Sequence, residues 1–164
     1  MEPKLEHPTR ENARPPRQTW RILFLDNQSN VALLKAACTD VGYTVVGALT
    51  IEEANAFLAG KDHVDVIVCA AHLEDESMLE FLCSVRTSEL HASAKFLILS
   101  MEPSRAGALL DRSTAKAGKA LGADKYVVMP VFDAAELVAQ IQLLQPAIPM
   151  LQQAETDGDI RPSR

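Results

Sequence analysis

The run Val64–Ala70 constrains the fold more than any other stretch of this chain. It reads Val-Asp-Val-Ile-Val-Cys-Ala and is the most continuously apolar short run in the sequence. Its β-branched side chains favour a strand, and a strand without polar alternation is buried on both faces. In an open parallel sheet such a strand lies in the centre, and ligands bind beyond its carboxyl end. That end reads Cys69-Ala70-Ala71-His72 and carries no carboxylate.

Four further strand patterns and five helical patterns alternate with this run. The other strands are expected at residues 21–25, 44–49, 95–99 and 126–128. The first intervening helix is indicated by apolar side chains at helical spacing, and a long helix is expected from about residue 103 to residue 121. Because strands and helices alternate with short connections, the sequence predicts an α/β protein, a five-stranded sheet with helices on both faces.

The two ends of the chain differ from its middle. The first 19 residues hold four prolines among charged residues and almost nothing apolar. Such a segment buries too little surface to offset its ordering entropy, so residues 1–19 are predicted to be a disordered tail. One folded domain is expected over residues 20–146, and a flexible tail over residues 147–164.

Composition excludes several classes of protein. The formal net charge of −6 argues against a general nucleic-acid binder, which needs a surplus of Lys and Arg. Three cysteines do not form a disulfide framework, and no apolar stretch has the length of a membrane span or a signal peptide. These features predict a cytoplasmic protein without a membrane partner. The C-terminal tail is too short for a DNA-binding module.

Four stretches, taken in order and spacing, resemble the response-regulator receiver domains over roughly residues 20–145. They are Ile22–Asn27, Val64–Ala70, Leu97–Ser100 and Gly122–Pro130, of which the last is the most specific. The resemblance implies the flavodoxin-like (βα)5 fold with strand order 2-1-3-4-5. It also implies a phosphorylation pocket: two acids that hold Mg²⁺, an acceptor Asp, a hydroxyl and a Lys.

The chain departs from that pocket at most of its positions. The matching residues are Asp26, Asn27, Ala70, Ser100 and Met129. Alanine has no nucleophile, a thioether cannot pair with a phosphate, and one carboxylate beside an amide holds Mg²⁺ poorly. We therefore expect a degenerate receiver with no catalytic residue, metal or cofactor. An acceptor relocated to Glu74 or Asp75 remains a remote alternative, because the in-line geometry would have to be rebuilt.

Two interpretations stay open for several of these side chains. Asp26 and Asn27 either cap the following helix or retain a cation. Ser100 and Tyr126 match the hydroxyl and the aromatic residue that move together in the family, or they are simply packed. His72 has no second ligand at metal spacing and is expected to be a solvated loop residue.

The three cysteines, Cys38, Cys69 and Cys83, all occupy apolar positions of their elements. Buried free cysteine is common, so a structural role is expected for each. The alternative is a thiol switch at Cys69, which lies beside the vacant acceptor position.

Four cations share one face of the fourth helix. They are Arg105, Arg112, Lys116 and Lys119, with Asp111 as the single acidic residue in that stretch. The pattern is typical either of a solvated helix face or of a contact for an acidic partner. Cyclic di-GMP is a further ligand by analogy with receivers that have arginine-rich fourth helices.

These observations together favour a non-enzymatic, phosphorylation-independent signalling or adaptor protein. It would bind a partner protein through the surface of the fourth helix, fifth strand and fifth helix, which in the family is also a dimer face. A cyclic di-GMP sensor and a cysteine redox switch are the alternatives.

Overall fold

The computed structural model describes residues 19–101 and 105–146, and for residues 105–109 it describes the backbone only. The strands are β1 (Arg21–Leu25), β2 (Thr44–Ala48), β3 (Val66–Ala70), β4 (Lys95–Ser100) and β5 (Lys125–Val128). The helices are α1 (Gln28–Asp40), α2 (Ile51–Leu58), α3 (Met78–Thr87), α4 (Arg105–Ala120) and α5 (Ala134–Leu144). Apart from Thr19, the two predicted tails lie outside the described residues.

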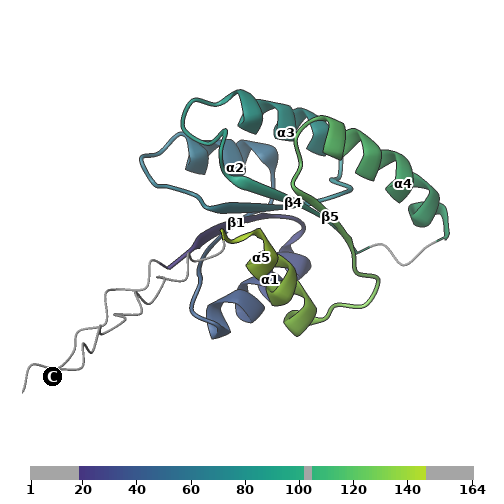
Figure 1. Ribbon diagram of the computed structural model, residues 1–164, viewed down its shortest axis with the longest axis horizontal. Coiled ribbons are helices and arrows are strands. Elements are labelled where there is room, and N and C mark those ends of the chain that lie inside the picture. Colours follow the sequence, from purple (N-terminus) through teal and green to yellow (C-terminus); the bar gives the residue numbers. More distant parts are fainter. Residues whose placement is uncertain (1–18, 102–104, 147–164) are drawn as a thin grey trace, which may run out of the picture.

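The five strands form one parallel sheet in the order β2-β1-β3-β4-β5. Helices α2, α3 and α4 cover one face, and α1 and α5 cover the other (Figure 1). Side-chain alternation along the strands produces this division. Leu23, Ile67 and Phe96 pack on the side of α2 and α3, whereas Phe24 and Val68 pack on the side of α1 and α5. The predicted α/β class and strand order are confirmed.

The central position of β3 is also confirmed, because all five of its residues are buried. The strand begins at Val66, two residues later than the apolar run. The reason lies in the side chain of Asp65, whose Oδ2 accepts the Arg21 amide at 2.8 Å in place of a backbone carbonyl. Helix α4 is described from Arg105 onward, and the predicted start near residue 103 lies outside the described residues.

Side-chain caps begin four of the helices. Each cap oxygen accepts a hydrogen bond from the backbone amide three residues later, and the caps are Asn27, Thr50, Ser77 and Asp133. These caps fix where the loops after β1, β2 and β3 end. Among the described residues, no helix is both long and apolar enough to cross a bilayer.

Arg86, near the end of α3, ties three segments together. Its guanidinium donates to the carbonyls of Ala92, Ala94 and Gly122 and pairs with Asp124 Oδ2 at 2.9 Å. Gly122 has φ +103°, a left-handed conformation that a side chain would strain. One side chain therefore fixes the start of β4 and the turn between α4 and β5.

Candidate functional site

The carboxyl ends of β1, β3 and β4 meet at one edge of the sheet. The strand register pairs Leu25 with Cys69 and Ala70 with Leu99, so the residues that follow these strands are neighbours. Four of the five predicted pocket residues line one cavity of about 70 Å³ there: Asp26, Asn27, Ala70 and Ser100. Four of the residues that the sequence analysis grouped together are therefore neighbours in the structure.

Asp26 is nearly buried, with 6% of its surface exposed. Its Oδ1 accepts hydrogen bonds from the Asn27 amide at 2.6 Å and from Asn30 Nδ2 at 3.1 Å. Burial raises the pKa of Asp26, and these two hydrogen bonds offset the rise only in part. Asn27 itself caps α1 by accepting the Asn30 amide at 2.9 Å. The capping interpretation is therefore confirmed for Asn27, whereas Asp26 orients the loop.

The floor of the cavity carries no nucleophilic side chain where β3 ends. Ala70 ends β3 with a methyl group where a receiver carries its acceptor carboxylate. Asp26 is the sole carboxylate among the described residues that line the 70 Å³ cavity. No group of three or more His, Cys, Asp or Glu in the described part of the chain could hold a metal. Mg²⁺ requires several oxygen ligands, so the residues present do not fit the ion that the receiver fold implies.

Met129 does not join the other pocket residues. It is buried against the core on the side of α1 and α5, and its Sδ accepts the Asp133 amide at 3.4 Å. The thioether thus helps to begin the last helix. The sequence could not reveal this, because the direction of a side chain after a strand depends on how the chain turns.

A polar cluster connects the cavity to α4. Tyr126 Oη donates to Asp111 Oδ1 at 2.5 Å, and His72 Nε2 lies 3.5 Å from the same oxygen. Ser100 Oγ is buried and makes no hydrogen bond of good geometry with a described residue, although it is near enough to influence both groups. The cluster spans β4, α4, β5 and the loop after β3.

The electrostatics of this cluster favour a charged Asp111. Burial raises its pKa, but the hydroxyls of Tyr126 and Ser100 and the proximity of His72 outweigh burial, so the net pKa is lowered. Burial and then the hydrogen bond to Asp111 raise the pKa of Tyr126 well above its ordinary value. A carboxylate held by a protonated phenol is the stable arrangement.

The buried position of Asp111 is the feature of this cluster that the sequence analysis missed. The pattern placed Asp111 on the cationic face of α4, but it is 6% exposed and points toward the sheet. A small residue on the same side of α4 could have indicated that this side faces the sheet. Gly118, seven residues after Asp111, is also buried and approaches Ile98 closely. His72 is solvent-exposed as expected, yet it also contacts Asp111.

Arg112, Lys116 and Lys119 are exposed and make no ion pair with a described residue. They share one face of α4, as the spacing predicts. The side chain of Arg105 lies outside the described part of the chain. Because Asp111 points inward, the exposed face is more uniformly cationic than the sequence indicated.

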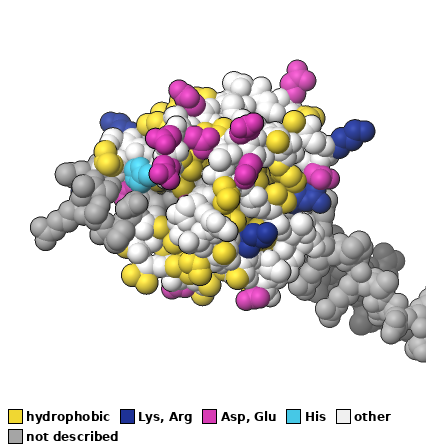
Figure 2. Space-filling view, turned by 180° about the vertical axis from the view of Figure 1, so that it is seen from behind, with side chains coloured by type: hydrophobic (Ala, Val, Ile, Leu, Met, Phe, Trp, Pro, Cys, Tyr) yellow, Lys and Arg dark blue, Asp and Glu magenta, His cyan; other side chains and the backbone are white. Residues whose placement is uncertain are grey.

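A larger, acidic cavity of about 460 Å³ lies next to the small one. The loop after β3 lines it with Glu74, Asp75 and Glu76, and Asp26 and His72 line both cavities. Acidic side chains also gather in the upper part of the face shown in Figure 2, several of them beside a His. Glu74 and Asp75 are exposed to solvent. A relocated phosphate acceptor would need an enclosed site, which these exposed positions do not provide.

Two of the three cysteines are buried, as their apolar positions predict, and the third is exposed. Cys69 is fully buried, and burial raises its pKa well above the ordinary value, which fits the expected structural role and disfavours the alternative of a thiol switch. Cys38 is also buried, and burial raises its pKa to about 12. Cys83 is exposed and not in the core, because the apolar face of α3 consists of Met78, Phe81, Leu82 and Val85.

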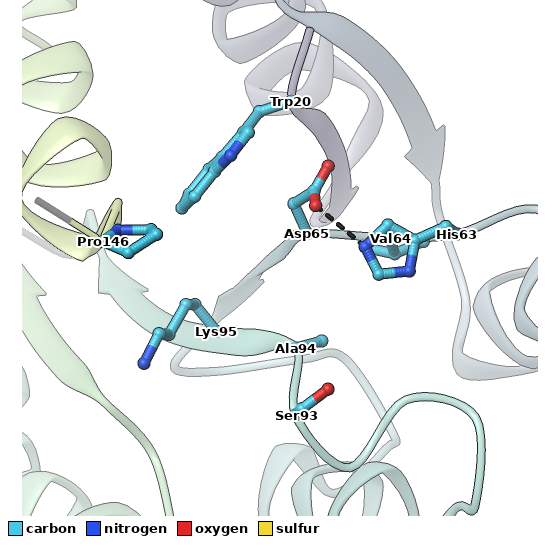
Figure 3. A pocket seen from close by; sticks show the side chains of 8 residues that line it. All are labelled: Trp20, His63, Val64, Asp65, Ser93, Ala94, Lys95 and Pro146. Atoms are coloured by element: carbon cyan, nitrogen blue, oxygen red, sulfur yellow. Dashed lines mark hydrogen bonds and ion pairs between the residues drawn. The ribbon is translucent and has the colours of Figure 1, made fainter. Parts of the chain in front are cut away.

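A separate cavity of about 390 Å³ lies at the amino ends of the strands. Trp20 and Pro146 flank one side, and His63 Nε2 lies 2.8 Å from Asp65 Oδ1 on another (Figure 3). Lys95 also lines it. In parallel sheets, ligand chemistry gathers at the carboxyl ends, so this cavity is not the candidate site.

Comparisons with known proteins agree with this architecture. No protein-family model matches the sequence, and no curated protein matches it. The chain is similar to the chemotaxis response regulator CheY4 of Vibrio cholerae, with 26% identity and a TM-score of 0.66, covering 77% of this chain and 99% of that one.

Two further solved structures show the same likeness. A putative response regulator from Chloroflexus aurantiacus is 25% identical with a TM-score of 0.65, covering 77% of this chain and 98% of its own. The response regulator TrrA of Thermotoga maritima, solved in complex with Mg²⁺-BeF, is 26% identical with a TM-score of 0.60, covering 77% and 100%. The chain thus has the CheY-like fold of the response-regulator receiver domains.

Proposed function

We propose that this chain is a phosphorylation-independent receiver-like signalling protein that has no enzymatic activity. The observation that carries the proposal is Ala70 at the end of β3, where a receiver carries its acceptor Asp. Two further differences support it, since the cavity does not fit Mg²⁺ and Met129 supplies no cation for a phosphoryl group.

The output would pass through a partner protein that binds the α4–β5–α5 surface. We define this surface by Arg112, Lys116 and Lys119 of α4, together with Val128 at the end of β5 and Val131 in the connection to α5. Val128 is 50% exposed and Val131 is 81% exposed. A surface that carries both exposed apolar side chains and unpaired cations suits a partner that presents an acidic and apolar patch.

The Tyr126–Asp111 hydrogen bond supports independence from phosphate. In the absence of a phosphoryl group on the carboxyl edge, the Asp111 carboxylate holds the Tyr126 hydroxyl from within α4. The ring is then fixed by the protein itself, and the surface around β5 keeps one shape.

A pull-down from the native host tests the proposal. The wild-type bait is compared with an Arg112→Glu, Lys119→Glu double variant and with a Lys35→Glu, Lys61→Glu control, which makes the same charge change at other exposed lysines. We expect one partner to be retained by the wild type and the control and lost from the double variant. Identical captures by all three baits would refute the assigned surface.

Independence from phosphorylation has its own test. Beryllofluoride with Mg²⁺ is added while the backbone amide resonances of Asp26, Ala70 and Ser100 are recorded. We expect no saturable change, because the site offers neither the acceptor nor the metal ligands. A saturable change would contradict the proposal even if the partner experiment succeeded.

A small anionic ligand such as cyclic di-GMP is the second candidate, and the three exposed cations of α4 favour it. Titration calorimetry with the wild type and the same double variant distinguishes it from a protein partner. Binding heat that is lost in the double variant would support this candidate, and its absence for the wild type would remove it.

A further inference from the structure

The two cavities at the carboxyl edge form one acidic recess. They share Asp26, Asn27 and His72 in their walls, and the outer cavity of about 460 Å³ lies within the size range of roughly 300–1,000 Å³ for small-ligand sites. Among the described residues that line either cavity, four are carboxylic acids and none is Lys or Arg. An anionic ligand is therefore disfavoured.

Much of this negative charge has no partner within the protein. Glu74 and Asp75 make no hydrogen bond or ion pair with a described residue. Glu76 is occupied, because its carboxylate accepts the Ile51 amide at 3.1 Å. Asp26 uses Oδ1 for two hydrogen bonds, whereas Oδ2 has no hydrogen bond to a described residue.

A buried hydroxyl gives an independent indication of a ligand. Ser100 is 1% exposed and lines the small cavity, and its Oγ, although close to Asp111 and Tyr126, has no hydrogen-bond partner of good geometry among the described residues. A buried hydroxyl without a partner is destabilising, so native structures usually supply one. The methyl group of Ala70 leaves the space beside it open.

The oxygen atoms that line the recess determine which kind of cation can bind there. No group of three or more His, Cys, Asp or Glu among the described residues could hold a metal, so a divalent cation would have few protein ligands here. A guanidinium requires no such ligand set, since its five N–H donors lie in a planar fork. It is also weakly hydrated and always charged, which suits a nearly buried carboxylate such as Asp26.

We propose that this recess binds a guanidinium group, with Asp26 and Ser100 as inner acceptors and Glu74 and Asp75 at the mouth. The guanidinium belongs either to an Arg side chain of a bound protein or to a free small molecule. The site is separate from the α4–β5–α5 surface, so it stands or falls independently of the partner proposed there.

Titrations followed by backbone amide resonances test this proposal on the full chain. The probes are ethylguanidinium, an acetylated and amidated Gly-Arg-Gly peptide, and Mg²⁺ alone. We expect saturable shifts at Asn27, Ala70 and Ser100 with at least one guanidinium probe at millimolar concentration. Binding of the peptide alone indicates a protein source, and binding of ethylguanidinium with equal or greater affinity indicates a small molecule.

Matched variants locate the binding group. Asp26→Asn keeps the shape and removes the charge, and it should weaken binding roughly tenfold or more. Asp40→Asn makes the same change at an exposed site on α1 and should leave binding unchanged. Glu74→Gln, at an exposed position, should weaken guanidinium binding about twofold. If Asp26→Asn does not fold, this variant tests whether the recess binds the guanidinium.

Three results would overturn the proposal. The first is the absence of saturable shifts with either guanidinium probe. The second is saturation by Mg²⁺ alone, which would make the recess a metal site. The third is unchanged guanidinium binding in folded Asp26→Asn, or in Glu74→Gln where Asp26→Asn does not fold.

Discussion

Replacing Tyr126 by Phe tests the polar cluster that joins the cavity to α4. The change removes one hydroxyl and retains the ring, so Asp111 loses the donor that lies 2.5 Å from its Oδ1. A hydrogen bond to a charged group contributes about 1.5–3 kcal/mol. His72, 3.5 Å away, still faces the carboxylate, so the lower half of that range applies. We expect the free energy of unfolding to fall by about 2 kcal/mol and the melting temperature by roughly 5–8 °C.

The loss should depend on pH in a defined way. The pKa of Asp111 is lowered in the folded protein, so its contribution is present above the ordinary carboxyl pKa of about 4 and is lost as the pH falls through the folded value. The pKa of Tyr126 is raised, so its contribution is present below about pH 10 and is lost as the pH rises through the folded value. The difference between wild type and Tyr126→Phe should be largest near neutral pH.

Urea unfolding of a double-mutant cycle with Asp111→Asn measures the pair directly. We expect a coupling energy of about 1 kcal/mol or more at neutral pH. Tyr43→Phe is the matched control, because the Tyr43 hydroxyl accepts a hydrogen bond from the neutral Gln145 side chain, and its loss should cost about 0.5–1 kcal/mol. A Tyr126–Asp111 coupling below about 0.5 kcal/mol would refute the reasoning.

Three further changes probe other parts of the fold. Arg86→Ala should lower the free energy of unfolding by about 2–4 kcal/mol in urea, because its hydrogen bonds join three segments, and a neutral result would contradict that role. Gly118→Ala should cost about 1–3 kcal/mol, since the new Cβ would lie 2.5 Å from Ile98 Cδ1, and Ile98→Val should recover part of the loss. In the native protein iodoacetamide should label Cys83 and spare Cys69, and equal labelling of both would contradict the observed burial.

Most of the fold could be predicted because each strand and helix carries its own local pattern of apolar residues. A buried parallel strand needs apolar residues on both faces, and Val66–Ala70 has them. Gly and capping residues marked the ends of the helices. The start of β3 was misplaced because the hydrogen bond from the Arg21 backbone amide to the Asp65 side chain forms only after the strands have come together.

The candidate site was predictable where position along a strand determines it. Asp26 and Ala70 lie at carboxyl ends of parallel strands, so their meeting follows from the topology. Asp111 and Cys83 depend on how a helix is rotated against the sheet, and charge spacing alone does not specify that rotation. Met129 depends on the turn into α5, which the sequence does not specify either.

The strand order also determines where the sheet is open to unwanted association. β2 and β5 are its two edges, and an exposed edge can recruit a strand from another copy. β5 has only four residues, begins with Lys125 and is followed after one residue by Pro130, which has no N–H to donate. β2 has the sequence Thr-Val-Val-Gly-Ala without a charge or a proline. We therefore expect fibrillar aggregation, if heating provokes it, to begin at β2.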